Sequence, residues 1–139
     1  MIAIDELTDE HVRQFLAQGL IAKELSDRLA VIPPGRHLKV NNGSALAMGG
    51  ITTVWPGVGV AWLKVFPDAI KYPIRLCRIV FDELCRAQED FKLHRIHIEV
   101  RADDPRAVRF AHLLSFVVES TMSKYGPDGA DYHMMTWQP

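Results

Sequence analysis

The sequence contains little cysteine and no long apolar run. Its two cysteines, Cys77 and Cys85, fall in one predicted helix, where their spacing corresponds to about 12 Å of rise. A disulfide needs Cα atoms within about 7 Å of each other, so we expect both to be reduced, buried thiols. A charged residue or a proline interrupts every apolar stretch before it reaches the length of a membrane span. We therefore expect no membrane partner.

An excess of charge of one sign is also missing. The chain contains 16 basic and 17 acidic residues, which gives a formal net charge of -1. Such a balance provides no long-range field to attract nucleic acid, so we expect no nucleic-acid partner. The first residues, MIAIDELTDEHVRQF, are acidic and lack the basic region and apolar run of a signal peptide. We accordingly expect a cytoplasmic location.

The composition is that of an ordinary folded domain. The chain has 139 residues, of which 48% are hydrophobic and 24% charged, and internal repeats and low-complexity linkers are missing. A chain of this length can bury a sizeable core, so we expect a single domain over residues 1–139. Of the histidines, His94 and His97 would face opposite sides of a strand. Without a third ligand beside them, no metal site is expected.

The spacing of apolar residues changes between helical and strand periods several times along the chain. Helices are predicted at 8–19, 20–30, 72–91 and 104–115, and strands at 1–7, 37–40, 45–54, 60–65, 94–102, 116–126 and 130–137. Gly19 is expected to end the first helix. The order is therefore β-α-α-β-β-β-α-β-α-β-β. Antiparallel strands come first and βαβ crossovers follow, so the expected fold class is α+β, a mixed α/β sandwich with a mixed sheet.

The segment IEVRADDPRAVRFAHLLSF, in the last third of the chain, carries the most specific motif. Asp104, Ala107, Ser115 and Phe116 stand where a known pattern has the Asn and Ala of Asn-x-x-Ala and a helix-ending Gly-Phe. The pattern resembles that of GCN5-related N-acetyltransferases (GNAT). The segment KYGPDGADYHMM resembles the final hairpin of ribosomal-protein N-acetyltransferases, and the PGVGVAWL meander resembles GNAT-like proteins of tailed phages. The resemblance implies a GNAT-like fold over nearly the whole chain.

The resemblance also implies a chemistry. Such enzymes move an acetyl group from acetyl-CoA to an amine, and the pantetheine amides pair with exposed backbone of the fourth strand. In this sequence that backbone belongs to Leu63, Lys64 and Val65. The pyrophosphate lies where the next helix begins, because a helix N-terminus offers unpaired N–H groups and partial positive charge. Asp104, at the position of the family Asn, is the remaining cofactor-side candidate.

The connection KVFPDAIKYPIRL departs from the family pattern because it lacks glycine. Lys71 and Pro73 stand where the family has glycines, which let the backbone approach a phosphate closely. Proline also removes one N–H donor. Lys71 and Arg75 are the residues that would supply charge to a pyrophosphate instead. The alternative is that both are solvated residues on an ordinary helix start.

Glu99 is the candidate catalytic base. On the strand at 94–102 it shares a face with His97 and Arg101, and it stands where the similar ribosomal enzymes carry a proton-accepting Glu. A base is needed because an ammonium has no lone pair with which to attack a thioester. The alternative is a carboxylate paired with Arg95 or Arg101 on a polar sheet face.

A proton donor for the leaving thiolate is harder to find. The family often has a Tyr seven residues after the Asn, and that place is taken here by Ala111. Tyr125, in the following hairpin, is the candidate substitute. The alternative is that Tyr125 has a packing role.

Two functions therefore stand against each other. The first is an acetyl-CoA-dependent N-acetyltransferase with a degenerate pyrophosphate loop, acting on an unknown amine, either a small molecule or a protein N-terminus or lysine. The second is a catalytically inactive GNAT-fold protein, phage-derived, with a structural or binding role and a place in the virion. Fold alone does not decide between them. A homodimer is left open as the assembly.

Overall fold

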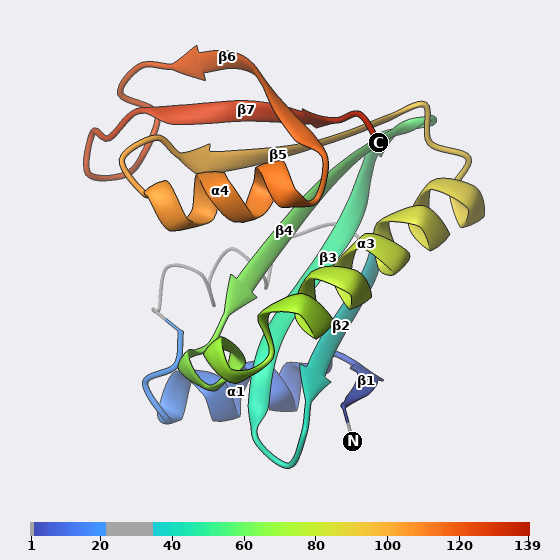
Figure 1. The fold of residues 1–139 in the computed structure, drawn as a ribbon, viewed down its shortest axis with the longest axis vertical. Helices are drawn as coiled ribbons and strands as arrows, with labels where there is room; N and C mark the ends of the chain where they lie inside the picture. Colours follow the sequence, from blue (N-terminus) through green and yellow to red (C-terminus); the bar gives the residue numbers. More distant parts are fainter. Residues whose placement is uncertain (1, 22–34) are drawn as a thin grey trace. The chain divides into compact units, whose positions relative to one another are not determined.

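The computed structural model describes residues 2–21 and 35–139 of the chain (Figure 1). Its elements are β1 (Ala3–Glu6), α1 (Asp9–Ala17), β2 (Gly35–Asn41), β3 (Ala45–Trp55), β4 (Val58–Val65), the 3₁₀ helix η1 (Pro67–Lys71), α3 (Pro73–Asp90), β5 (Arg95–Arg101), α4 (Pro105–Leu113), β6 (Phe116–Met122) and β7 (Tyr132–Trp137). The predicted elements outside 20–30 match these in order and type, except that η1 was not predicted. The predicted helix at 20–30 lies almost wholly outside the described residues.

The strands form a mixed sheet, which confirms the predicted fold class. Within the described ranges the strand order is β1-β2-β3-β4-β5-β7-β6. Neighbouring strands are antiparallel at β1–β2, β2–β3, β5–β7 and β6–β7, whereas β4 and β5 are parallel. Since α3 connects the parallel pair, the chain makes the predicted βαβ crossover at this point.

The described residues gather into two compact units. The N-terminal unit comprises Met1–Thr52 and Leu63–Lys71, and the C-terminal unit comprises Thr53–Trp62 and Tyr72–Pro139.

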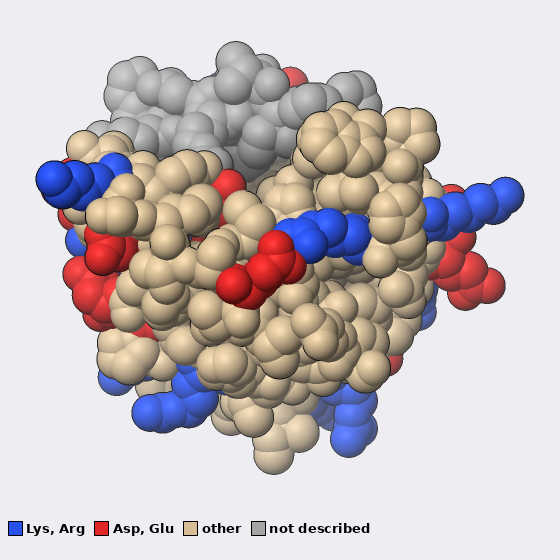
Figure 2. All heavy atoms as spheres, turned by 90° about the horizontal axis from the view of Figure 1, so that it is seen from above, with Lys and Arg blue, Asp and Glu red and all other residues tan. Residues whose placement is uncertain are grey.

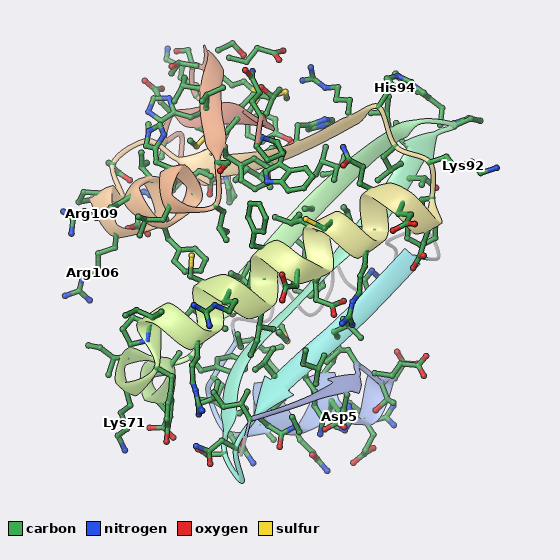
Figure 3. All side chains as sticks on the ribbon, turned by 45° about the vertical axis from the view of Figure 1, so that its right-hand side comes forward. Asp5, Lys71, Lys92, His94, Arg106 and Arg109 are labelled. Carbon is green, nitrogen blue, oxygen red and sulfur yellow. The ribbon has the colours of Figure 1, made fainter. Side chains whose placement is uncertain are left out.

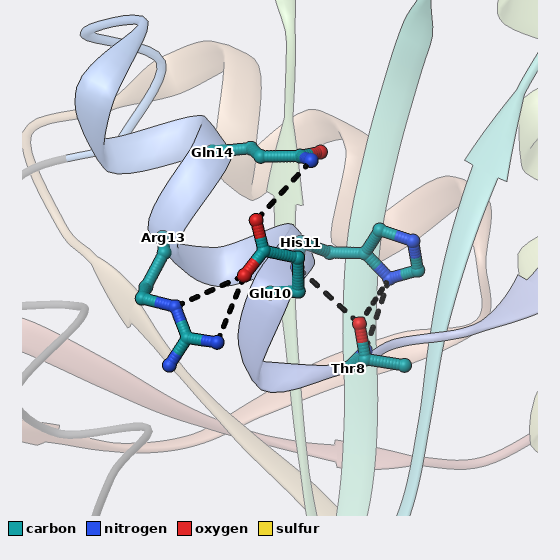
Figure 4. Close-up of polar contacts among 5 residues, drawn as sticks. All are labelled: Thr8, Glu10, His11, Arg13 and Gln14. Carbon is teal, nitrogen blue, oxygen red and sulfur yellow. Dashed lines mark hydrogen bonds and ion pairs between the residues drawn. The ribbon is translucent and has the colours of Figure 1, made fainter.

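The N-terminal unit begins with a well-capped helix. Thr8 is the N-cap of α1, and it exchanges two hydrogen bonds with His11: the His11 N–H donates to Thr8 Oγ1 at 3.3 Å, and the Thr8 N–H donates to His11 Nδ1 at 3.0 Å (Figure 4). This reciprocal arrangement is a capping box with histidine in the place of the usual glutamate. On the exposed side, Arg13 Nη2 pairs with Glu10 Oε2 at 2.8 Å.

At its other end, α1 finishes as predicted around Gly19. The residue lies one position beyond the C-cap in the left-handed region, with φ of 72°. Its N–H donates to the Leu16 carbonyl and the next N–H donates to the Phe15 carbonyl, which is the bond pattern of a Schellman motif. The Phe15 ring is buried and packs on Phe66, with ring centroids 5.1 Å apart. This contact forms the aromatic part of the unit's core.

In the C-terminal unit, α3 contributes Leu76, Leu84 and Ala87 to the core. Both cysteines were expected to be buried, and this was wrong: Cys77 is half-buried and Cys85 is exposed. Both are free thiols, as expected. The expectation of burial failed because Leu76, Leu84 and Ala87 mark the centre of the apolar stripe, and Cys85 lies outside it.

Trp137 contacts both α3 and the end of α4 in the C-terminal unit. Its ring packs edge-on against Phe81 of α3, with centroids 5.6 Å apart, and its Nε1–H donates to the Leu114 carbonyl at 2.8 Å. That carbonyl belongs to the C-cap of α4, which packs on β5 and β6 (Figure 1). Ser115 follows in the left-handed region with φ of 79°, the strained geometry expected where the family has glycine.

The turn between β3 and β4 fixes where β5 begins. Gly57 has φ of 87°, and its carbonyl accepts the N–H groups of His94 at 2.8 Å and Arg95 at 3.1 Å. A Cβ built on Gly57 would lie 2.3 Å from the imidazole of His94. Figure 3 shows His94 in the connection between α3 and β5. The backbone conformation therefore favours glycine here, and a Cβ would require the exposed His94 ring to shift.

Candidate active site

Strand β5 presents two chemically different faces. Ile96 and Val100 are buried, whereas His97, Glu99 and Arg101 are half-buried on the opposite face. The alternation is the one predicted from the sequence. The polar face of β5 therefore holds Glu99 between a histidine and an arginine.

Glu99 and Tyr125 are brought together by the fold. The Tyr125 hydroxyl donates a hydrogen bond to Glu99 Oε1 at 2.8 Å. Tyr125 comes from the loop between β6 and β7 and is 50% exposed, so the pair faces solvent. The Tyr125 ring also packs edge-on against Tyr132 of β7, with centroids 5.6 Å apart. Sequence reasoning named Glu99 and Tyr125 separately, and the structure joins them into one site.

The neighbouring arginines have partners other than Glu99. Arg95 binds Glu119 through two hydrogen bonds, of 2.8 and 3.1 Å. Arg101 binds Asp103 at 2.7 Å and Asp128 at 2.6 Å. The expected alternative for Glu99, an ion pair with Arg95 or Arg101, is therefore not the arrangement found among the described residues.

The contacts of Arg101 were missed by sequence reasoning. Hydrogen bonds to Asp128 and Asp103 hold the pKa of Arg101 above its ordinary value. The hydrogen bond from Arg101 in turn lowers the pKa of Asp128. The sequence did contain a signal for these contacts. Arg101 lies two residues from Glu99 and so shares its strand face, and the acidic segment GPDGAD lies in the loop that carries Tyr125.

His97 lies beside Glu99 as a neutral hydrogen-bonding group. Burial, with a further contribution from the charge of Arg95, lowers the pKa of His97 below its ordinary value. Its Nδ1 accepts a hydrogen bond from Arg95 Nε at 3.2 Å. A neutral imidazole that accepts at Nδ1 carries its proton on Nε2, so His97 offers a donor on this side of β5.

The ladder between β4 and β5 covers only part of both strands. Val58, Gly59 and Val60 pair with Arg95, Ile96 and His97. The backbone of Leu63, Lys64 and Val65, predicted to face a pantetheine arm, belongs to the last part of β4, beyond this ladder.

The glycine-free connection folds as a 3₁₀ helix followed directly by α3. None of its residues has a positive φ, so its conformation does not require glycine. Tyr72 is the N-cap of α3 and its side chain does not cap the helix, and Pro73 is the first helical residue. Because proline has no N–H, the unpaired donors of this end belong to Ile74 and Arg75.

The charged residues predicted at this connection are exposed. Lys71 is the last residue of η1 (Figure 3), and Arg75 lies in the first turn of α3. Within the described ranges neither side chain forms an ion pair with an acidic residue. Their positions are compatible with either predicted role, phosphate contact or simple solvation.

Asp104 has a local structural role. It is the N-cap of α4, and its Oδ1 accepts the Ala107 N–H at 3.1 Å. Ala111, at the place of the family tyrosine, is buried in α4. Alanine has no side-chain proton to donate, so position 111 provides no general acid. The tyrosine in contact with Glu99 is Tyr125.

A separate hollow lies within the N-terminal unit. It measures about 540 Å³ and is lined by residues of α1, of β2 and its following turn, and of the connection after β4, among them His11, Gln14, Phe15, Lys39, Phe66 and Asp68. Sequence reasoning did not anticipate it.

Other classes of site find no support in the described ranges. No three His, Cys, Asp or Glu side chains there gather closely enough to hold a metal ion. In the same ranges, no helix combines the length and apolar character needed to cross a membrane. On the face shown in Figure 2, basic and acidic side chains are interspersed around uncharged surface.

The fold is shared with N-acetyltransferases of known structure. A spermidine N-acetyltransferase chimera of Vibrio cholerae SpeG and hSSAT matches with a TM-score of 0.75 and 13% identity, over 98% of this chain and 94% of its own. A GNAT-family acetyltransferase from Streptococcus pneumoniae matches with a TM-score of 0.71 and 16% identity, over 98% of both chains. No family model and no curated protein sequence matches the chain. The chain therefore has the GNAT fold, as predicted.

Proposed function

We propose that this protein is an acetyl-CoA-dependent N-acetyltransferase that acts on an amine, with Glu99 as its base. The observation that carries the proposal is the hydrogen bond from Tyr125 to Glu99 on the polar face of β5, within a GNAT fold. An ion-paired Glu99 would have favoured a structural role. The carboxylate instead has a tyrosine as its partner and lies on a half-buried, solvent-facing strand position.

In the proposed reaction, Glu99 removes a proton from the incoming ammonium. The amine nitrogen then attacks the thioester carbonyl carbon, the C–S bond breaks, and the CoA thiolate takes up the Tyr125 proton. The second proton lost by the attacking nitrogen returns to the Tyr125 oxygen, and Glu99 releases its proton to solvent. While Tyr125 donates to Glu99, it stabilises the ionised carboxylate. Once Glu99 has accepted the amine proton, the hydroxyl no longer faces an anion, and its proton becomes available for the thiolate.

Acetyl-CoA is the proposed co-substrate, held by three groups of atoms. The backbone of Leu63, Lys64 and Val65 would pair with the pantetheine amides. The N–H groups at the start of α3, with Lys71 and Arg75, would face the pyrophosphate. Asp104 would contribute indirectly, by fixing the first turn of α4.

One observation favours a second candidate, a GNAT-fold binding protein without transfer activity. Pro73 at the first position of α3 removes a donor at the place where the family holds its pyrophosphate. A protein of this kind would bind acetyl-CoA weakly or not at all. The phage-derived virion component considered from the sequence is one form of this candidate.

Calorimetry with acetyl-CoA, followed by an amine panel, separates the two candidates. Spermidine belongs in the panel because a similar structure is a spermidine N-acetyltransferase. Lysine-bearing and N-terminal peptides extend it to protein acceptors. Acetylated product that requires Glu99 supports the proposal, whereas the absence of turnover with every amine of the panel, together with weak or no acetyl-CoA binding, favours the second candidate. A cytoplasmic location is part of the first proposal, and the assembly is left open.

A further inference from the structure

We infer that Arg101 is a positioning residue for the Glu99–Tyr125 pair. Its ion pairs with Asp103 and Asp128 hold the loop of residues 123–131 so that the Tyr125 hydroxyl reaches Glu99. We call Arg101, Asp103 and Asp128 the arginine latch. The catalytic part of this inference rests on the proposed function, and the structural part does not.

The latch connects the end of β5 to the loop that carries Tyr125. Arg101 Nε donates to Asp103 Oδ1 at 2.7 Å, and Arg101 Nη2 donates to Asp128 Oδ2 at 2.6 Å. Asp103 follows the same strand, whereas Asp128 lies in the loop. A guanidinium can make both contacts because its N–H groups project in different directions of one plane, which a lysine ammonium does not reproduce.

Arg101 and Glu99 are also placed by the same strand geometry. They lie two residues apart on one face of β5, and Arg101 pairs across the sheet with Tyr132 of β7. Tyr132 is the residue on which the Tyr125 ring packs. The Tyr125 ring therefore contacts Tyr132 of the sheet, and the arginine latch holds the loop three residues further along the chain, at Asp128.

The backbone of the loop has its own bonds, which the latch supplements. Gly126 N–H donates to the Ala130 carbonyl, Gly129 N–H to the Gly126 carbonyl, and Ala102 N–H to the Asp131 carbonyl, at 2.9 Å each. These bonds close the loop on itself and tie its last part to the residue after β5. Among the described residues, the Arg101–Asp128 pair of the arginine latch is the side-chain ion pair that joins the tip of this loop to β5.

The expected effect on stability is small. The Arg101, Asp103 and Asp128 side chains are 38%, 66% and 53% exposed. Exposed ion pairs of this kind contribute little to folding, so breaking one should leave the melting temperature nearly unchanged. The same small free energy is sufficient to change how often the loop holds Tyr125 against Glu99, by up to about fivefold.

Nuclear magnetic resonance of the whole chain tests the structural part. In Asp128→Asn we expect the ring-to-ring nuclear Overhauser effect between Tyr125 and Tyr132 to weaken, and the Gly126 and Gly129 amides to exchange faster. The control is Arg13→Gln, which breaks the exposed Arg13–Glu10 pair of 2.8 Å on α1. Unchanged ring contacts and exchange in Asp128→Asn would overturn the inference, whatever the activity of the protein.

Kinetics of the same variants test the catalytic part. Asp128→Asn should lower kcat by up to about fivefold in the wild-type background, with little effect on KM for acetyl-CoA. In a Tyr125→Phe background it should have no further effect, because the latch acts through the hydroxyl. Equal losses in both backgrounds would contradict a positioning role. Absence of turnover in the wild type would refute the proposed function alone, since the resonance measurements still decide the latch.

Discussion

The Tyr125 hydroxyl lies 2.8 Å from Glu99 Oε1, although 26 residues separate the two in the chain. The strand β5 supplies one partner and the β6–β7 loop the other. A tyrosine that contacts the carboxylate directly gives the site both an acceptor and a donor of protons. This arrangement makes Glu99 and Tyr125 testable as a pair.

Replacing Glu99 by Gln should slow acetyl transfer by about 10²–10⁴-fold, the usual contribution of a positioned acid or base. Glutamine keeps the shape and still accepts the Tyr125 hydrogen bond, but it does not remove the amine proton. Acetyl-CoA binding, measured by calorimetry, should hardly change, because in the proposed reaction the carboxylate acts on the amine and not on the cofactor. Glu119→Gln, on the same sheet, is the control and should retain turnover. Full turnover by Glu99→Gln would show that Glu99 is a structural residue.

Much of the fold could be predicted from the sequence because local signals were strong. Alternation in β5 placed Glu99 on the polar face, and Gly19 marked the end of α1 correctly, whereas β4 begins at Val58 and not at residue 60. The insertion of β7 between β5 and β6 follows from long-range pairing, which no local pattern specifies.

The site was harder to predict than the fold. Glu99 and Tyr125 were both named, but their contact depends on the conformation of a nine-residue loop (123–131) closed by backbone bonds and by Asp128. The roles of Arg101 and Asp128 depend on that same conformation. Asp104 was matched to a family motif, and its visible role is to cap α4.

Charge reversal of Lys71 and Arg75 together should abolish acetyl-CoA binding and remove its salt dependence. The reason is that these exposed cations flank the start of α3, where Pro73 has already removed one backbone donor. Binding is measured by calorimetry at two ionic strengths. Reversal of Arg86 and Lys92, near the other end of α3, changes the net charge equally and should leave affinity intact. Equal affinity in the Lys71 and Arg75 double variant would refute their role.

Acetyl-CoA should bind weakly even to the wild-type chain, because the connection before α3 lacks glycine. A ligand present at 100 times its dissociation constant stabilises a protein by about 2.7 kcal/mol. Thermal melting with increasing acetyl-CoA therefore reports the affinity directly. A clear rise in melting temperature at low micromolar acetyl-CoA would contradict weak binding.

Gly57→Ala should destabilise the protein by more than Gly43→Ala. Both glycines have positive φ, of 87° and 81°, so both variants lose about 1 kcal/mol through backbone strain. Only at Gly57 would the new Cβ lie 2.3 Å from His94, whereas a Cβ on Gly43 meets nothing within 4 Å. Urea denaturation of both variants isolates this packing difference. Equal losses would show that His94 moves aside without cost.

The stability of the protein should fall as the pH is lowered through about 6.5, the ordinary pKa of histidine. Burial lowers the pKa of both His97 and His37 in the folded state. Below the unfolded-state pKa the unfolded chain binds more protons at these positions, so the free energy of unfolding decreases with falling pH until the folded-state pKa is passed. Denaturation curves between pH 8 and about pH 5 measure the effect. His97→Gln should remove part of this dependence and His37→Gln another part. If neither substitution flattens the curve, the two imidazoles titrate alike in the folded and unfolded states, and the assignment of His97 as a neutral donor beside Glu99 fails with it.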